Sequence, residues 1–240
     1  MNRKKEYVLL FVLSIIFLAA GRYVFRIWEV YHEAEEGYQK LKQYIVEGVD
    51  ENEVDEGKDQ MADSKETEKI ARKIDFDGLR AINKDIVAWI QIPGIGVDYP
   101  VVQGEDNEYY LHYTFDGKEN IAGSIFLDYR NRADFTDRKV ILYGHNMQDG
   151  SMFSHLAKYQ DKDFREEQGR VILYLPGKTL ECEVLECRQV PVRDTVYEII
   201  EEEKRKVPDQ VMLSTCSTSD DVRLVLICKV KITLWIYRRA

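Results

Sequence analysis

A long apolar segment near the N-terminus is the feature of this sequence that most restricts how the chain can fold. It follows three basic residues, Arg3, Lys4 and Lys5, and Ser14 is the only polar side chain in residues 7–21. An apolar helix without a polar face must be enclosed completely, either by a protein core or by lipid. The rest of this 240-residue chain would form too modest a domain to enclose it, so the segment is predicted to span a membrane.

The apolar segment is just long enough to cross a bilayer once. Counted through to Phe25 it has nineteen residues, and about 20 are needed to cross the hydrocarbon core as a helix. Arg22 near its outer end can extend toward the headgroups, and Trp28 suits the interface. The basic residues before the segment predict a cytoplasmic N-terminus. We therefore expect a cytoplasmic tail over residues 1–6, a transmembrane anchor over residues 7–27, and an extracellular domain held at the cell membrane.

A cleaved signal peptide is the competing interpretation of the same segment. Ala19, Ala20 and Gly21 are small enough to suit a cleavage site. However, Leu18 breaks the usual small-x-small pattern, and no cysteine follows for lipid attachment. The pattern therefore favours an uncleaved anchor.

Residues 28–69 are predicted to connect the anchor to a folded domain over residues 70–240. Apolar residues recur at spacings of three and four, which predicts one packing face of a helix to about Val46: Trp28, Tyr31, Ala34, Tyr38, Leu41 and Ile45. Residues 47–69 carry ten acidic and three basic side chains and almost no large apolar ones. They cannot bury enough surface to offset the entropy of ordering, so an acidic linker is expected. The net charge of −9 argues against a nucleic-acid partner.

The remaining sequence is typical of a mainly β domain. Runs rich in Val, Ile, Leu and aromatic residues, separated by Gly, Asp and Asn, predict strands over residues 86–92, 124–127, 139–143, 171–175, 179–188, 210–215 and 223–234. Such spacing suggests a barrel or a sandwich. Helices are predicted from about residue 70 to 82, over residues 152–159, and over residues 195–206, where Asp194 or Thr195 can cap the first turn.

One of the four cysteines stands apart from the others. Cys182 and Cys228 lie inside apolar strand patterns, where a cysteine usually behaves as a small buried hydrophobe, and Cys187 can be another strand residue. Cys216 instead ends an apolar run and is followed at once by a polar turn. A side chain at the end of a strand can be exposed and still be held rigidly, as a nucleophile requires.

A catalytic cysteine needs a base or a positive charge nearby, because an ordinary thiol is mostly protonated at neutral pH. His145 follows the apolar run of residues 140–144, and Arg223 opens the strand after Cys216. If the three strand ends converge, they supply a nucleophile, a proton carrier and a cation for a developing oxyanion. A structural role for each remains the alternative on these patterns alone. No carboxylate and histidine cluster has ligand-like spacing, so we expect no metal and no cofactor.

Several short motifs occur in the order seen in sortases of Gram-positive bacteria, and they resemble class B most closely. They are Trp89-Ile90-Gln91-Ile92-Pro93, Asp98-Tyr99-Pro100-Val101-Val102-Gln103-Gly104, Gly123-Ser124-Ile125-Phe126-Leu127-Asp128, Leu142-Tyr143-Gly144-His145-Asn146-Met147, Met152-Phe153 and Leu213-Ser214-Thr215-Cys216. The resemblance covers roughly residues 70–234. It implies an eight-stranded β-barrel with N-terminal helices and a helix in the loop before the cysteine-bearing strand.

The resemblance also implies an activity, that of a membrane-anchored thiol transpeptidase acting in cell-wall anchoring. Cys216, His145 and Arg223 would be its catalytic residues. It would cleave a C-terminal sorting signal of a secreted protein after a Thr, through a thioester, and transfer the protein to an amine of peptidoglycan or its precursor. Ser214 and Thr215, beside Cys216, and Val192, before the predicted helix, are expected to line the substrate groove. A cysteine peptidase acting by hydrolysis, a sortase of another class, and an inert anchored binding domain are the alternatives.

Overall fold

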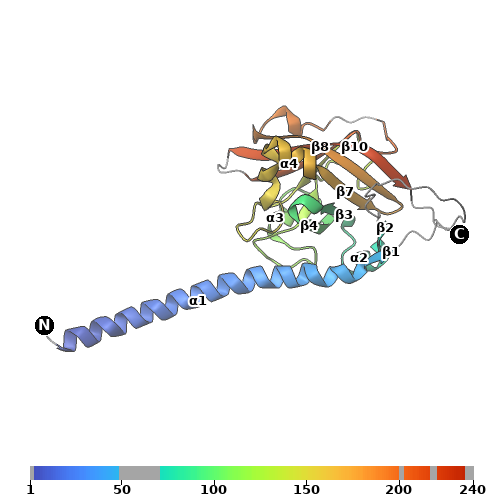
Figure 1. Ribbon diagram of the computed structural model, residues 1–240. Coiled ribbons are helices and arrows are strands. Elements are labelled where there is room, and N and C mark those ends of the chain that lie inside the picture. Colours follow the sequence, from blue (N-terminus) through green and yellow to red (C-terminus); the bar gives the residue numbers. More distant parts are fainter. Residues whose placement is uncertain (1–2, 49–70, 200–202, 217–220, 236–240) are drawn as a thin grey trace, which may run out of the picture.

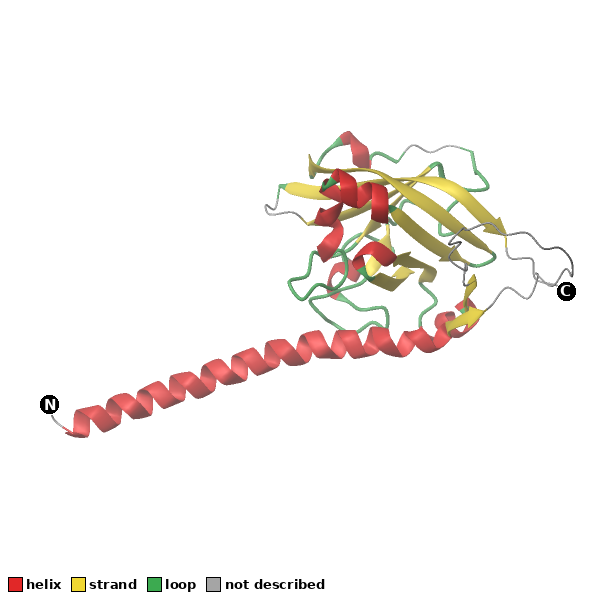
Figure 2. Cartoon of the chain, in the orientation of Figure 1, coloured by secondary structure: helices red, strands yellow, loops and turns green. Residues whose placement is uncertain are grey.

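The computed structural model describes residues 3–48, 71–199, 203–216 and 221–235 as a β-barrel with a long N-terminal helix lying against it (Figure 1). The helix, α1, spans Arg3–Leu41 and extends well beyond the barrel at its N-terminal end (Figure 2). Within the described residues, one helical stretch is long and apolar enough to cross a membrane, and it begins at Phe11. The side chains of residues 11–26 are exposed, so the barrel does not enclose this part of α1.

The C-terminal part of α1 packs on the barrel through the predicted apolar face. Ala34, Tyr38 and Leu41 are buried, and Tyr31 packs partly against the same core. The predicted helix end at about Val46 is wrong, because α1 ends at Leu41. A 3-10 turn, η1 (Lys42–Tyr44), and a strand, β1 (Ile45–Gly48), follow it.

The segment predicted as one helix from about residue 70 to 82 is a strand followed by a helix. β2 (Ala71–Ile74) pairs with β1 in an antiparallel ladder, and α2 covers Phe76–Ile82. The helix begins at Phe76, later than predicted, because the Asp75 side chain caps it by accepting a hydrogen bond from the Gly78 N–H at 3.0 Å. Phe76 and Leu79 are the buried residues of α2.

Eight strands close the barrel in the order β10-β8-β7-β3-β4-β5-β6-β9, as the sequence resemblance implies. The two pairs β4–β5 and β6–β9 are parallel, and the others are antiparallel. The strands are β3 (Ile86–Ile92), β4 (Val97–Val102), β5 (Ile125–Leu127), β6 (Lys139–Tyr143), β7 (Arg170–Leu175), β8 (Lys178–Pro191), β9 (Gln210–Cys216) and β10 (Val222–Trp235).

Seven of these strands match the predicted ones to within three residues at either end, and β4 was not predicted. Pro100 lies inside β4 and lowers the strand signal, because proline cannot donate to a ladder. Pro100 is opposite Trp89 of β3, and β4 pairs with β5 only at Val101 and Val102, which follow the proline. A 3-10 turn, η2 (Pro93–Ile95), joins β3 to β4.

The predicted helices inside the domain are shorter than expected. The one over residues 152–159 is a 3-10 helix, η3 (Ser154–Gln160), and is followed by an unpredicted helix, α4 (Lys162–Gln168). The prediction of a helix over residues 195–206 is wrong. The structure has a 3-10 turn, η4 (Thr195–Tyr197), and no helix at residues 198–199 or 203–206. Residues 200–202 lie outside the described part of the chain. Asp194 does cap the turn, accepting from the Val196 N–H at 2.8 Å.

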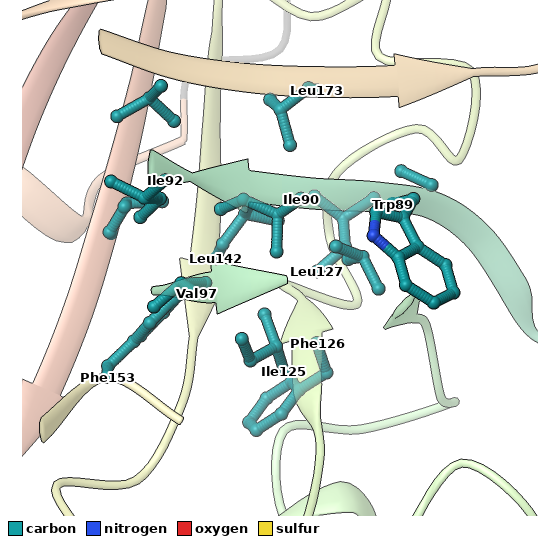
Figure 3. Close-up of a cluster of buried hydrophobic side chains, with 14 of the residues drawn as sticks. Trp89, Ile90, Ile92, Val97, Ile125, Phe126, Leu127, Leu142, Phe153 and Leu173 are labelled. Carbon is teal, nitrogen blue, oxygen red and sulfur yellow. The ribbon is translucent and has the colours of Figure 1, made fainter. Parts of the chain in front are cut away.

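The barrel interior is filled by large apolar side chains from strands far apart in the sequence. Figure 3 shows Ile90 of β3, Phe126 of β5 and Leu173 of β7 in one buried cluster. Trp89 is also fully buried, and its indole N–H donates to Asp98 at 2.7 Å. Interiors packed in this way resist displacement of their strands. The barrel therefore fixes where its strand ends lie, which positions the residues that follow them.

Candidate active site

The ends of β6, β9 and the start of β10 lie side by side at one rim of the barrel. In the antiparallel β9–β10 pair, Cys216 is directly opposite Arg223. In the parallel β6–β9 pair, Tyr143 is opposite Ser214, and the Gly144 N–H donates to the Ser214 carbonyl at 3.2 Å. His145 follows Tyr143 by two residues, just as Cys216 follows Ser214. The backbone positions of the three candidate catalytic residues are therefore brought to the same rim.

The His145 ring is held by a backbone carbonyl of a neighbouring segment. Its Nε2 lies 2.7 Å from the carbonyl oxygen of Leu111, in the short helix α3 (Tyr109–His112). A carbonyl oxygen can only accept, so Nε2 must carry a proton and donate it. In the neutral ring this assigns the lone pair to Nδ1, and Nδ1 becomes the basic nitrogen.

The backbone around His145 is held as closely as its ring. The His145 carbonyl accepts a hydrogen bond from the Phe153 N–H at 2.9 Å, which closes the loop that follows. A Cβ at position 144 would lie 2.8 Å from the Phe153 ring. Glycine is therefore required before His145 for this close approach, as Gly144 in the sequence indicated.

Arg223 enters the site from β10 and is partly buried. Its Nη1 donates to the Val222 carbonyl at 3.2 Å. Because Arg223 and Cys216 are register partners in an antiparallel ladder, their Cα atoms are the nearest across the two strands. A guanidinium supplies a positive charge and several donors in a fixed plane, which suits an oxyanion.

The three cysteines away from this rim have thiols that resist ionisation. Burial raises the pKa of Cys182 to about 12 and that of Cys187 to about 11, and it also raises the pKa of Cys228. All three are free, and Cys182 and Cys228 are buried, as predicted from their strand patterns. Across the described ranges, no three His, Cys, Asp or Glu side chains group closely enough to hold a metal ion.

The residues predicted to line the substrate groove occupy different environments. Ser214 is buried, and its hydroxyl is 2.8 Å from the Tyr197 hydroxyl. Thr215 is also buried, and its hydroxyl has no hydrogen-bond partner among the described residues. Val192 is 43% exposed just beyond β8, where its N–H donates to the Asp221 carbonyl at 3.0 Å. Val192 thus reaches the surface of the rim, whereas Ser214 and Thr215 lie beneath it.

A buried carboxylate beside the rim was not identified from the sequence. Asp128 is fully buried and accepts hydrogen bonds from the Arg130 Nε and Nη2 at 2.9 and 2.7 Å, and from the Tyr143 hydroxyl at 2.9 Å. Arg130 also donates to the Tyr197 carbonyl at 3.2 Å, and the Tyr143 and Tyr197 rings stack. Asp128 therefore ties β6 to the η4 turn. The sequence signal that could have identified Asp128 is its position directly after the apolar run of residues 125–127.

Replacing Asp128 by asparagine will destabilise the protein in a pH-dependent way. Burial favours the neutral acid, but the hydrogen bonds from Arg130 and Tyr143 outweigh it and hold the Asp128 pKa below its ordinary value of 3.8. A lowered folded-state pKa contributes stability above the unfolded value, and this is lost as the pH falls through the folded pKa. We expect D128N to lower the free energy of unfolding by about 1–3 kcal/mol at pH 7.

Urea unfolding of the wild type and D128N at pH 7 and below pH 4 measures this effect. The difference between the two proteins should shrink at the lower pH, where wild-type Asp128 begins to take up a proton. A difference that is equally large at both pH values would show that ionised Asp128 is not its source.

Comparison with known proteins gives consistent matches to one family. Residues 90–231 match the family model for the sortase domain. Sortase B of Staphylococcus aureus is 30% identical over 251 aligned positions, which cover 93% of this chain and 94% of that protein. Sortase B of Listeria monocytogenes is 54% identical over 86 residues, and this match spans 36% of this chain and 35% of that protein.

A solved structure shows the same architecture. The Staphylococcus aureus sortase B–substrate complex superimposes with a TM-score of 0.58 and 28% sequence identity. The superposition covers 65% of this chain and 84% of the solved chain. The likeness therefore supports the β-barrel fold of a class B sortase.

Proposed function

Because the chain belongs to the sortase family of cysteine transpeptidases, with class B sortases as its relatives, we propose that it cleaves a sorting signal and transfers the cleaved protein to an amine of the cell wall. The scissile bond follows a Thr in a short, Pro-containing motif near the C-terminus of a secreted protein. The observation that carries this proposal is the register of β6, β9 and β10, which gathers Cys216, His145 and Arg223 at one rim.

In the first half of the reaction, Cys216 forms a bond with the substrate. The Cys216 sulfur, as thiolate, attacks the carbonyl carbon of the Thr, and the carbonyl π electrons move to oxygen. The Arg223 guanidinium stabilises the resulting oxyanion. The C–N bond then breaks, and the departing nitrogen takes a proton from His145. The products are a thioester on Cys216 and a free amine on the released fragment.

In the second half, an amine of peptidoglycan or its precursor replaces the sulfur. His145 accepts a proton from this amine as the nitrogen attacks the thioester carbon. Collapse of the second tetrahedral species breaks the C–S bond and returns the thiolate. The hydrogen bond from Nε2 to the Leu111 carbonyl supports this role, because it fixes the tautomer in which Nδ1 carries and accepts the transferred proton.

We further propose that α1 anchors the enzyme in the cytoplasmic membrane, with its N-terminus inside the cell and the barrel outside. The exposed apolar residues of α1 and the basic residues before them support this topology. The proposed units are a tail over residues 1–6, an anchor over residues 7–27, a stem and linker over residues 28–69, and a catalytic domain over residues 70–240. In Figure 1, β10 runs away from the side on which α1 extends, so the proposed topology would turn the first residues of β10 toward the membrane.

A peptide assay on the purified full-length protein in detergent tests the proposed function. The substrates are a library of labelled peptides that contain a Thr and a Pro, each with and without triglycine as the acceptor amine. Transfer predicts a Thr–Gly product whose yield rises with triglycine, and a thioester adduct visible by mass spectrometry. Cleavage to the free acid alone, unaffected by triglycine, would instead identify a cysteine peptidase. No cleavage of any peptide would leave the inert binding domain as the better description.

Arg223→Lys separates the charge of this residue from its shape. Lysine keeps the positive charge but loses the planar set of donors, so we expect acylation to slow about tenfold, and by about 10²–10³ in Arg223→Ala. Arg188→Lys is the matched control, because Arg188 is exposed on β8 and pairs with Glu186 at 3.1 Å. Equal acylation rates in R223K, R223A and the wild type would remove Arg223 from the mechanism.

A further inference from the structure

We propose that the stem part of α1, residues 30–41, positions the active site by holding the segment whose carbonyl group binds His145. That segment, residues 109–124, runs from α3 to the start of β5 and includes Leu111. The stem would then act as a structural part of the catalytic centre in addition to connecting it to the membrane. This inference rests on the proposed role of His145 and deepens it.

Hydrogen bonds at two places along α1 join it to the segment of residues 109–124. The Tyr38 hydroxyl donates to the Gly123 carbonyl at 2.7 Å and lies 3.2 Å from the Ser124 hydroxyl. Slightly more than two turns earlier in α1, the Val30 carbonyl accepts a hydrogen bond from the Asn120 side-chain amide at 2.8 Å. Burial raises the pKa of the Tyr38 phenol above its ordinary value of 10.0, so the hydroxyl remains a donor. Both Tyr38 and Asn120 are buried, and the hydrogen bonds of Tyr38 are shielded from water.

The residues that α1 holds are bonded to the residues on either side of Leu111. The Ser124 N–H donates to the Tyr110 carbonyl at 2.9 Å, and the Asn120 N–H donates to the His112 carbonyl at 2.8 Å. The peptide groups that carry the Tyr110 and His112 carbonyls, one on each side of the peptide group that carries the Leu111 carbonyl, are thus bonded to residues that α1 contacts. Since these groups define the direction of the intervening Leu111 carbonyl, they also define where the His145 Nε2 finds its acceptor.

Gly123 leaves almost no free space between the two parts of this segment. Its φ is +54°, and a Cβ at this position would lie 2.6 Å from the Tyr110 carbonyl oxygen and 2.7 Å from that of Leu111. A shift of Gly123, which accepts the Tyr38 hydrogen bond, must therefore move Tyr110 and Leu111 as well. Close-packed interiors have low compressibility and transmit strain between the groups in contact.

The consequence concerns the orientation of the imidazole ring. Catalytic groups must be held within about 0.5 Å of their productive geometry, and a misplacement of about 1 Å can reduce the rate by up to about 10²-fold. Weakening the contact between α1 and residues 120–124 should release the Leu111 carbonyl and allow the His145 ring to change its partner. Tyr38 and Asn120 are therefore assigned as positioning residues, since they act on His145 through Leu111.

The test compares Tyr38→Phe and Asn120→Ala with Tyr31→Phe in the full-length protein in detergent. Tyr31 lies on the same face of α1 and packs against the core, but it takes no part in the hydrogen bonds described above between α1 and residues 120–124. Three quantities are measured: the kcat and KM for the labelled peptide, the unfolding temperature, and the nitrogen-15 shifts of the His145 ring. The shifts report which ring nitrogen carries the proton, and comparison with His145→Gln assigns them among the four histidines.

We expect Y38F and N120A to lower kcat about three- to tenfold with little change in KM, and to decrease the population of the Nε2-protonated tautomer. Y31F should match the wild type in both respects. If kcat and the ring shifts of folded Y38F equal those of the wild type, the positioning role is overturned. If N120A fails to fold, the kcat and ring shifts of Y38F decide whether α1 positions His145, because Y38F lacks only one oxygen atom.

The ring shifts keep this inference separate from the proposed function. A wild-type protein that never acts on sorting peptides, but whose His145 tautomer responds to Y38F, would overturn the proposed activity and support the positioning by α1. Normal transfer activity in the wild type, together with a His145 ring that does not respond to Y38F, would support the proposed activity and overturn the positioning by α1.

Discussion

Cys216→Ala will abolish formation of the acyl-enzyme, and no thioester adduct will be found by mass spectrometry. Without sulfur there is no nucleophile, and neither His145 nor Arg223 can form the covalent intermediate in its place. We expect the rate of peptide cleavage to fall by at least about 10⁴-fold, to the background. The unfolding temperature should change little, because Cys216 is the last residue of β9 and the ladder depends on its backbone.

Cys187→Ala provides the matched control for the loss of a thiol. Cys187 is free and half-buried, its thiol lies 3.6 Å from the Leu156 carbonyl oxygen, and burial raises its pKa to about 11. This variant should keep the thioester adduct and the wild-type rate. An adduct that persists in C216A, or that disappears in C187A, would assign the nucleophile to a different cysteine.

His145→Ala will reduce transfer by about 10³–10⁴-fold while leaving Cys216 and Arg223 in place. The loss combines two functions, protonation of the leaving nitrogen and deprotonation of the acceptor amine, and each step of general acid–base catalysis contributes about 10²–10⁴. Single-turnover measurement of acylation and of thioester aminolysis separates the two steps. Both should slow, because the same ring serves in each.

His145→Gln distinguishes proton transfer from simple hydrogen bonding. The glutamine amide can donate to the Leu111 carbonyl, as the His145 Nε2 does at 2.7 Å, but it cannot carry a proton between groups. We expect H145Q to be as inactive as H145A and closer to the wild type in stability. His155→Gln, in η3, is the control and should retain full activity. An active H145Q would mean that His145 only orients the substrate.

Much of the barrel could be predicted from the sequence because its strands carry local signals. β3 and β6 have the predicted bounds, Ile86–Ile92 and Lys139–Tyr143, since runs of buried apolar residues between polar turns are visible in a short window. The packing face of α1 was also visible, because a helix repeats its buried positions every three or four residues. β4 was missed, since Pro100 removes a donor that a strand normally needs.

The termination of helices was predicted less well, because it depends on neighbours in space. The apolar pattern over residues 195–206 suits a helix, yet only η4 forms in the described part of this range. The Tyr197 hydroxyl contacts Ser214, its carbonyl accepts from Arg130, and its ring stacks on Tyr143. These contacts reach β9, β6 and the loop after β5, and they hold the turn in a shape that the local sequence does not encode.

The sequence by itself determined the chemistry that the candidate site can offer, a thiol, an imidazole and a guanidinium, each at the end of a strand. Only the tertiary structure decided that β6, β9 and β10 are neighbours, that Asp128 is buried beside them, and that Tyr38 reaches Gly123 across 85 residues of sequence. The physical reason is that periodicity and turn residues report interactions between near neighbours in the chain. A hydrogen bond between distant segments leaves no periodic trace in either of them.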